Sequence, residues 1–277
     1  MQRIIHIFLI ISVYLLTLSC TKDHHIVIEN FFYSDSVTHQ DPHSKNVFDL
    51  RSEVRLSMLR STSDDEREQK IVKNINNFIK DQVSEGFKTT DGDSLVREIS
   101  HSYVMELLDI ARSRYSSSDE ESSDLLSGYD DTELYCTFYN NVDSECHFGL
   151  GDTIICFTGN TSCYMGGAHP GEESFAYSFS LNDGNIVRPN KLLKKNCKSE
   201  MIQRIKQKLI KQNKVKNEEE LQGLGFKDIF ISPNILLEKD SILFHYKNYT
   251  IAPFYLGSID IKFGYDELSD ITTLSTD

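Results

Sequence analysis

The feature that most constrains the fold is a strictly alternating segment that ends in a glycine turn. Within Ser174–Leu181 every second residue is large and apolar, and Asn182-Asp183-Gly184-Asn185 then precedes Ile186-Val187. Alternation with period 2 places the apolar side chains on one face of a strand. Asp-Gly between two strand-like runs is a strong hairpin signal. The segment therefore predicts an antiparallel sheet that is buried on one face.

Further elements of the second half follow from the same kind of pattern. Runs of β-branched and aromatic residues bounded by Gly, Asn or charged turns predict six strands, at Leu134–Asn140, Thr153–Thr158, Ser162–Met165, Ile235–Glu238, Ser241–Tyr246 and Gly257–Phe263. Helical spacing predicts a basic amphipathic helix over 191–211, a short acidic helix around 218–221 and a last short helix near Asp266. Regular alternation of strands and helices is absent, which favours antiparallel pairing.

The first half is dominated by two predicted helices. Ser63 or Asp64 can cap the first one, apolar residues recur at helical spacing to Val83, and Gly86 ends it. The second is predicted from Ser94 to Tyr115. Each has a single apolar stripe, so we expect both to pack on a common sheet. The fold class is therefore α+β, a mostly antiparallel sheet with packed helices, preceded by a smaller helix-containing α+β region.

The N-terminus predicts export. Arg3 supplies a positive charge, the run from Ile4 to Leu18 is apolar and too short to span a bilayer, and Ser19-Cys20 follows. The small residue at −1 and the apolar one at −2 resemble a lipobox, although Thr17 stands where Leu is commonest. We expect cleavage before Cys20 and lipidation of that cysteine, with palmitate among its acyl chains. An uncleaved N-terminal anchor with a chance cysteine is the alternative, and both place the remaining chain outside the cytoplasm.

These patterns predict a division of the chain into five parts. Thr21–Glu29 lacks periodicity and is interpreted as a tether, and Asn30–Ser44 as a loop or early strand. The Ser/Asp/Glu-rich stretch after Tyr115 cannot bury a core, and its spacing does not fit a calcium loop. The expected parts are a signal peptide (1–19), the lipidated Cys20 with its tether (20–44), the smaller N-terminal α+β region (45–115), a linker or loop (116–130) and a C-terminal α+β domain (131–277).

The charge of the chain restricts the classes of molecule that it can bind, and its cysteine content restricts the possible disulfides. The 42 Asp and Glu against 29 Lys and Arg give a net charge of −13, which opposes binding to nucleic acid and fits a cationic protein or a sugar polymer. Five cysteines besides Cys20 are an odd number, so at least one thiol is free or pairs between molecules. Cys136–Cys146 and Cys156–Cys163 are open pairings. Cys146-His147 lacks a paired CxxC or HxxxH, and we expect neither a metal nor a cofactor.

Two motifs are candidate sites. The first is Tyr164-Met165-Gly166-Gly167-Ala168-His169-Pro170-Gly171, in which Gly166 and Gly167 allow positive φ. Its loop either presents His169 to a ligand or is a tight turn in which His169 satisfies a buried backbone group. The second is the tyrosine-rich corner at 244–257, including Tyr249, Pro253 and Tyr255. Such aromatic density is typical of packing at a sheet end, and alternatively of a tyrosine-lined surface for a protein or glycan.

Together these motifs resemble a known family. The segment from roughly Leu134 to Leu274 is similar to the RsiV-type C-terminal domain. The likeness rests on Gly-Gly-Ala-His-Pro after a strand, the alternating strand with its Asn-Asp-Gly turn, the helix, the hairpin and Tyr-x-Ile-Ala-Pro-Phe-x-x-Gly, in this order. The resemblance implies an extracytoplasmic α+β domain without established catalysis, and in the anti-sigma factor RsiV the ectodomain binds lysozyme. This chain departs from that pattern: its signal peptide begins at Met1, so we expect neither a cytoplasmic anti-sigma segment nor a spanning helix.

These observations predict a non-catalytic envelope lipoprotein that binds an extracytoplasmic protein, lysozyme-like in kind, or a peptidoglycan-type glycan. Gly166, Gly167, His169, Tyr249, Pro253 and Tyr255 are its expected binding residues. One alternative is a cell-wall hydrolase with His169 as general base and Cys163, Glu172 or Glu173 nearby. Another is a structural or surface-antigen lipoprotein. The expected location is the periplasmic side of the outer membrane, with surface display or the inner membrane as alternatives.

Overall fold

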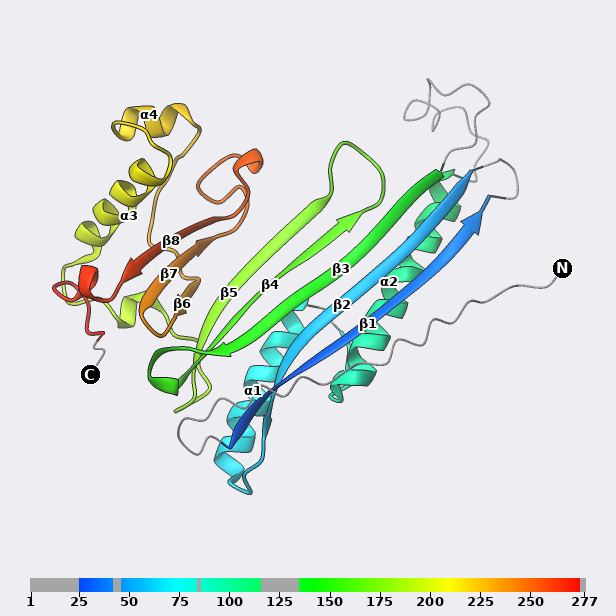
Figure 1. Cartoon of the computed structure of the whole chain (residues 1–277), viewed down its shortest axis with the longest axis horizontal. Helices are drawn as coiled ribbons and strands as arrows, with labels where there is room; N and C mark the ends of the chain where they lie inside the picture. Colours follow the sequence, from blue (N-terminus) through cyan, green and yellow to red (C-terminus); the bar gives the residue numbers. More distant parts are fainter. Residues whose placement is uncertain (1–24, 42–45, 84–85, 116–134, 275–277) are drawn as a thin grey trace.

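The computed structural model describes residues 25–41, 46–83, 86–115 and 135–274. The predicted lipidation at Cys20 and the predicted linker at 116–130 lie outside these residues. Two β-sheets of unequal size organise the described chain, and each has its own set of covering helices (Figure 1). Both sheets are dominated by antiparallel pairing, so the predicted α+β class is confirmed.

The larger sheet has five strands in the order β1-β2-β3-β4-β5. They span Ile26–Gln40, Val47–Ser61, Tyr135–Phe148, Ile154–Tyr164 and Gly171–Ser180. All neighbours are antiparallel except β2 and β3, which are parallel. A parallel pair needs a long crossover, and here the crossover contains two helices, α1 and α2, spanning Glu66–Val83 and Gly92–Tyr115.

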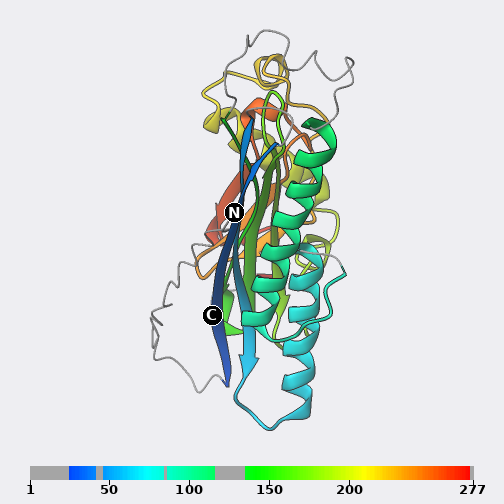
Figure 2. The same ribbon diagram turned by 90° about the vertical axis from the view of Figure 1, so that its right-hand side faces the viewer.

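Both crossover helices lie on one face of the large sheet, as Figures 1 and 2 show. The apolar stripe of α1, including Ile75 and Ile79, is buried there together with Leu95 and Ile99 of α2. The carboxylate of Asp91 accepts a hydrogen bond from the backbone N–H of Ser94 at 2.9 Å and caps the start of α2. The two predicted helices and their common sheet are therefore confirmed.

The smaller sheet has three antiparallel strands in the order β6-β7-β8, spanning Ile235–Leu237, Ser241–Tyr246 and Ile259–Gly264. Its helices are α3 at Lys198–Gln212 and α4 at Glu218–Gly223. Met201, Ile205 and Leu209 of α3 join the small sheet in a second buried core. Short 3-10 turns complete the fold at Leu150–Asp152, Pro189–Lys191, Phe254–Leu256 and Asp266–Leu268.

The two sheets meet where β5 approaches β6. Alternation along β5 sends Phe175, Tyr177 and Phe179 into the helix-covered core, as predicted, while Ser178 faces the small sheet. The Ser178 hydroxyl donates to the carbonyl of Ile235 at 3.1 Å and accepts the N–H of Leu237 at 2.8 Å. Side-chain bonds of this kind replace the backbone ladder that would otherwise join the two sheets.

Several predicted element bounds need correction. Strand β1 begins at Ile26, inside the segment interpreted as a tether, and β2 was not predicted. Helix α3 starts at Lys198 rather than Lys191, because the chain first makes the 3-10 turn at Pro189–Lys191. The turn after β5 leads to an isolated bridge between Phe179 and Ile186 rather than to a long hairpin. Among the described helices, none is long and apolar enough to cross a membrane.

Candidate functional site

The two sequence motifs meet in space and form an aromatic patch, which we define as His169, Tyr249 and Phe254. The Phe254 ring contacts both of the others: its centroid is 4.6 Å from that of His169 and 5.2 Å from that of Tyr249. The interplanar angles are 31° for His169, a tilted pair, and 24° for Tyr249, a stacked pair. His169 comes from the β4–β5 connection and the other two from the loop after β7, so the patch bridges the two sheet units.

The loop after β7 has buried anchors that hold its exposed rings in place. Ile251 and Ala252 are buried, and the carbonyl of Ile251 accepts the N–H of Lys227 at 3.0 Å. Pro253 packs on Gly225, where a Cβ would lie 2.5 Å from the proline Cγ. Between these anchors and β7, Tyr249 adopts φ +63° while 65% of it is exposed. Positive φ is unusual for a bulky side chain.

The β4–β5 connection presents His169 to solvent. Gly166 and Gly167 have φ values of +86° and +116°, in line with the expected glycine-dependent turn. The hydroxyl of Tyr164 donates to the carbonyl of Gly167 at 3.0 Å. His169 is exposed and its Nδ1 bonds the carbonyl of Pro170 at 3.0 Å, so it does not satisfy a buried backbone group.

The remaining predicted binding residues lie beside the patch. Tyr255 is 72% exposed, and its hydroxyl donates to the carbonyl of Leu224 at 3.0 Å. Pro253 is half-buried against Gly225 and positions the turn that carries Phe254. Phe254 itself was not among the predicted site residues, although it stands in the Tyr-x-Ile-Ala-Pro-Phe motif.

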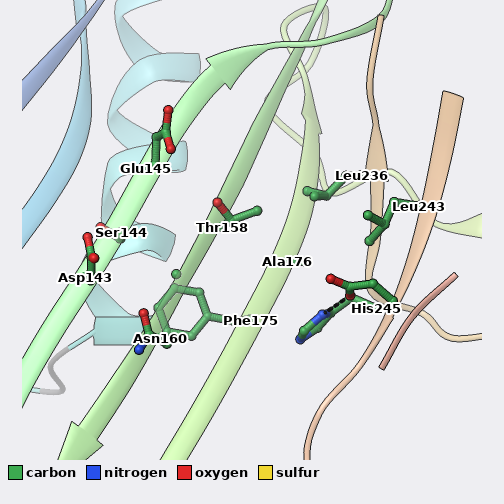
Figure 3. Close-up of a pocket in the computed structure, with 12 residues that line it drawn as sticks. Asp143, Ser144, Glu145, Thr158, Asn160, Phe175, Ala176, Leu236, Leu243 and His245 are labelled. Atoms are coloured by element: carbon green, nitrogen blue, oxygen red, sulfur yellow. Dashed lines mark hydrogen bonds and ion pairs between the residues drawn. The ribbon is translucent and has the colours of Figure 1, made fainter. Parts of the chain in front are cut away.

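A cavity of about 300 Å³ lies in the seam between the two sheets (Figure 3). Its polar lining includes Asp143 and Glu145 of β3, Asn160 of β4 and Asp260 of β8, and its lining contains no Lys or Arg. On the β7 side, His245 points toward this cavity in Figure 3. Three carboxylates, of which Asp260 is bonded to His245, and the absence of Lys and Arg from the lining make the seam cavity attractive to cations and unfavourable to anions.

His245 forms the centre of a hydrogen-bonded chain across three strands. Its Nδ1 lies 2.7 Å from the Oδ1 of Asp260, and its Nε2 lies 2.9 Å from the hydroxyl of Ser174. With Nδ1 donating to the carboxylate, Nε2 accepts the serine proton, which is the polarity of a serine-histidine-aspartate relay. The three residues of this hydrogen-bonded chain are separated in the sequence and match no local motif. Sequence patterns therefore do not reveal it.

One ion pair connects the patch to the seam. Lys247, between His245 and Tyr249 in the loop, pairs with Glu173, the neighbour of Ser174. The end of β7 and the start of β5 therefore run beside each other from the cavity to the aromatic patch. By contrast, Cys163, Glu172 and Glu173 line a different cavity of about 530 Å³, whose lining does not include His169.

All five cysteines in the described chain are free thiols, so neither open disulfide pairing is formed. Cys146 is buried on the helix-covered face, and burial raises the pKa of its thiol. Its neighbour His147 points to the other face of the sheet, because successive side chains of a strand alternate. Cys146 and His147 therefore cannot share a ligand, and His147 instead lies beside Cys156 and Glu238.

Comparison with known proteins finds a family model that matches part of the chain. Residues 185–266 match the family model described as a protein of unknown function, DUF3298. The match includes α3, α4, the small sheet and the loop that carries Tyr249 and Phe254. No curated protein matches the chain.

Two solved structures are similar to nearly the whole chain. The crystal structure of a DUF3298 family member from Bacteroides fragilis superposes with a TM-score of 0.66 at 20% identity, covering 91% of this chain and 96% of that one. A DUF3298 family protein from Pseudomonas aeruginosa gives a TM-score of 0.49 at 11% identity, covering 87% and 94%. The first likeness shows a shared fold across both sheets.

Proposed function

We propose that this chain, with its DUF3298 segment, is a binding lipoprotein that captures a basic extracytoplasmic protein through the aromatic patch. The observation that carries the proposal is the conformation of Tyr249. A left-handed backbone costs an L-residue about 1–2 kcal/mol, and Tyr249 accepts this cost while its ring is mostly exposed. Glycine would adopt the same turn without that cost. Strain of this kind is concentrated at ligand-binding sites.

The arrangement of the rings favours a protein over a glycan as the ligand. Sugars bind to aromatic side chains through open ring faces, whereas the Phe254 ring already packs against the rings of Tyr249 and His169. The patch presents the exposed ring and hydroxyl of Tyr249, which suit the mixed apolar and polar contacts of a protein interface. Tyrosine is enriched among residues that dominate binding energy in such interfaces.

Charge supports a basic partner. The chain has a net charge of −13, and the seam cavity beside the patch has three carboxylates in its lining. Complementary charge accelerates encounter and excludes acidic competitors. The resemblance to the RsiV-type domain adds a specific partner of this class, a lysozyme, which is a small basic enzyme.

Binding to immobilised lysozyme tests the proposal directly. The full chain, purified in detergent, is expected to bind in a salt-dependent manner, and Phe254→Ala is expected to weaken binding at least 30-fold, since central interface residues contribute about 2 kcal/mol or more. Tyr135→Ala is the matched control, because Tyr135 is also largely exposed but lies on β3. Absence of lysozyme binding at low salt, or equal affinity of the Phe254 variant, would contradict the proposal, and binding of muropeptides instead would favour the glycan alternative.

Membrane attachment forms the second half of the proposal. We place the protein on the periplasmic side of the outer membrane, held by lipid on Cys20. Metabolic labelling with a palmitate analogue is expected to mark the wild-type chain, and Cys20→Ser is expected to abolish the label and the membrane association. A Cys20→Ser chain that stays membrane-bound would favour an uncleaved N-terminal anchor.

A second candidate function rests on the Ser174–His245–Asp260 chain. In a hydrolase, the Ser174 hydroxyl would attack an ester or amide carbonyl while His245 takes its proton and passes it to the alcohol or amine that leaves as the carbonyl's ester or amide bond breaks. Water would then hydrolyse the acyl-serine, giving the free acid and restoring the Ser174 hydroxyl. Two observations disfavour this candidate: the orienting carboxylate Asp260 is 54% exposed, and the serine lies within a regular strand. A fluorophosphonate probe decides the matter, since a hydrolase is labelled at Ser174 and Ser174→Ala is not. Among the described residues, the hydrogen-bond partner of His169 is the backbone carbonyl of Pro170 rather than a carboxylate or a nucleophile, and its ring packs against Phe254.

A further inference from the structure

A second cluster of functional side chains lies at the other end of the seam. We define the junction cluster as His147 of β3, Cys156 of β4 and Glu238 directly after β6. The Nε2 of His147 lies 2.8 Å from the Oε2 of Glu238. One nitrogen, one sulfur and one carboxylate oxygen, one from each residue, all lie within 4.8 Å of one another.

The fold brings these three residues together through register and close approach. His147 and Cys156 are direct partners in the β3–β4 pair, so their side chains lie on the same face. The thiol of Cys156 donates to the carbonyl of Leu237 at 3.3 Å, which holds the end of β6 over it. Gly149 leaves room for this contact, because a Cβ there would lie 2.0 Å from the Leu237 oxygen and 2.9 Å from the Cys156 sulfur.

Burial at the cluster is graded from the thiol to the solvent. Cys156 is fully buried, whereas the side chains of His147 and Glu238 are 36% and 25% exposed. An ion could therefore reach the sulfur from the solvent side and keep one coordination position open to water.

We propose that the junction cluster is a zinc-binding site. Thiolate, imidazole and carboxylate are the ligands that Zn²⁺ takes in proteins, and three of them with a fourth open position form a familiar coordination set. The sulfur disfavours Ca²⁺ and Mg²⁺, which prefer all-oxygen ligands. Binding would deprotonate the Cys156 thiol and release its proton to solvent. Because Glu238 belongs to the small sheet and the other ligands to the large one, the ion would also clamp the two sheets together.

Cobalt and zinc titrations test the site on the metal-free full chain, purified in detergent with a non-thiol reductant. One equivalent of Co²⁺ alone is expected to give a thiolate-to-cobalt charge-transfer band that Zn²⁺ displaces. His147→Ala, Cys156→Ser and Glu238→Gln are each expected to weaken Zn²⁺ binding at least tenfold, since even outer-shell changes cost about 10–100-fold. Cys197→Ser, at a partly exposed cysteine before α3, is the matched control and should bind like the wild type.

Two results would overturn the proposal. One is a cobalt spectrum without the charge-transfer band, or with the same band in Cys156→Ser. The other is equal Zn²⁺ affinity of the wild type and Glu238→Gln. Far-ultraviolet circular dichroism identifies variants that fail to fold; if Cys156→Ser does so, Glu238→Gln, whose change lies nearer the surface, decides the outcome.

Discussion

Comparison of the variants Tyr249→Gly and Tyr249→Ala separates the effect of backbone strain on stability from the effect of the tyrosine ring on binding. Both changes remove the ring that stacks on Phe254, which costs about 0.5–1.5 kcal/mol of stability. Glycine alone also relieves the left-handed backbone, a gain of about 1–2 kcal/mol, and loses about 0.5–1 kcal/mol through the greater entropy of its unfolded chain. Tyr249→Gly is therefore expected to be more stable than Tyr249→Ala by about 0.5–1 kcal/mol and to lie close to the wild type.

Urea unfolding of the three proteins measures these free energies, and lysozyme binding measures function. Both variants should lose affinity to the same extent, because both lack the exposed ring. The glycine variant would then have nearly the stability of the wild type but would not bind lysozyme. This combination is expected if Tyr249 contributes to ligand binding rather than to folding. Equal stabilities of the glycine and alanine variants would refute the strain argument, and retained binding in either would remove Tyr249 from the site.

Three further predictions concern the seam and the surface. Gly149→Ala should lower the free energy of unfolding by about 1–3 kcal/mol, because its Cβ would lie 2.0 Å from the Leu237 carbonyl; denaturant unfolding measures this, and an unchanged midpoint would contradict it. Ser178→Ala should cost about 1–3 kcal/mol in the same assay by leaving buried groups of β6 without their partner. The hydrogen bond from Arg204 lowers the pKa of Asp270, so their ion pair stabilises the fold above the carboxyl's ordinary pKa of 3.8, and this stabilisation is lost as the pH falls through the lowered pKa. Asp270→Asn should therefore reduce the urea midpoint at pH 7 and have less effect at pH 3. An equal reduction at both pH values would contradict this prediction.

The helices were predictable because their signal is local. A single apolar stripe needs only one neighbouring surface, and α1 and α2 find it on the same face of the large sheet. Strand β2 was missed although Leu50, Val54, Leu56 and Met58 carry period 2 and are all buried. The buried Ser52 interrupts the apolar alternation. A search for period 2 that allows one polar residue among the apolar positions would still predict this strand.

Strand β1 was harder to predict because it is an edge strand. Its burial alternates only between half-buried and exposed along most of its length, so polar residues such as Ser34 and Asp35 occupy it freely. What defines it is pairing with β2 over its whole length, a tertiary property. The number of apolar residues in such a segment is therefore a poor predictor of an edge strand, because the strand pairs with one neighbour and buries few side chains.

The candidate sites show the same division between local and tertiary information. Both aromatic motifs could be recognised in the sequence, yet only the fold places His169 against Phe254. Cys146 and His147 are potential ligands that are adjacent in the sequence, although adjacent strand residues face opposite ways. The β3–β4 register selects Cys156 as the partner of His147 instead, and that register depends on the tight connection at Gly149.

The aromatic patch and the junction cluster are linked by the seam on which both depend. Glu238 precedes β7 and Tyr249 follows it, so the six residues of β7 separate the two sites by roughly 20 Å. The patch combines His169 from the large-sheet unit with two rings from the small-sheet unit, so its geometry requires a fixed position of one sheet on the other. A cation held by both sheets would pre-organise the patch and reduce the cost of binding. Zinc is therefore expected to raise the affinity of the wild type for its protein partner and to leave that of Cys156→Ser unchanged. Equal affinities with and without zinc in the wild type would mean that the hydrogen bonds and ion pairs between the sheets, such as those of Ser178, hold them in register without an ion.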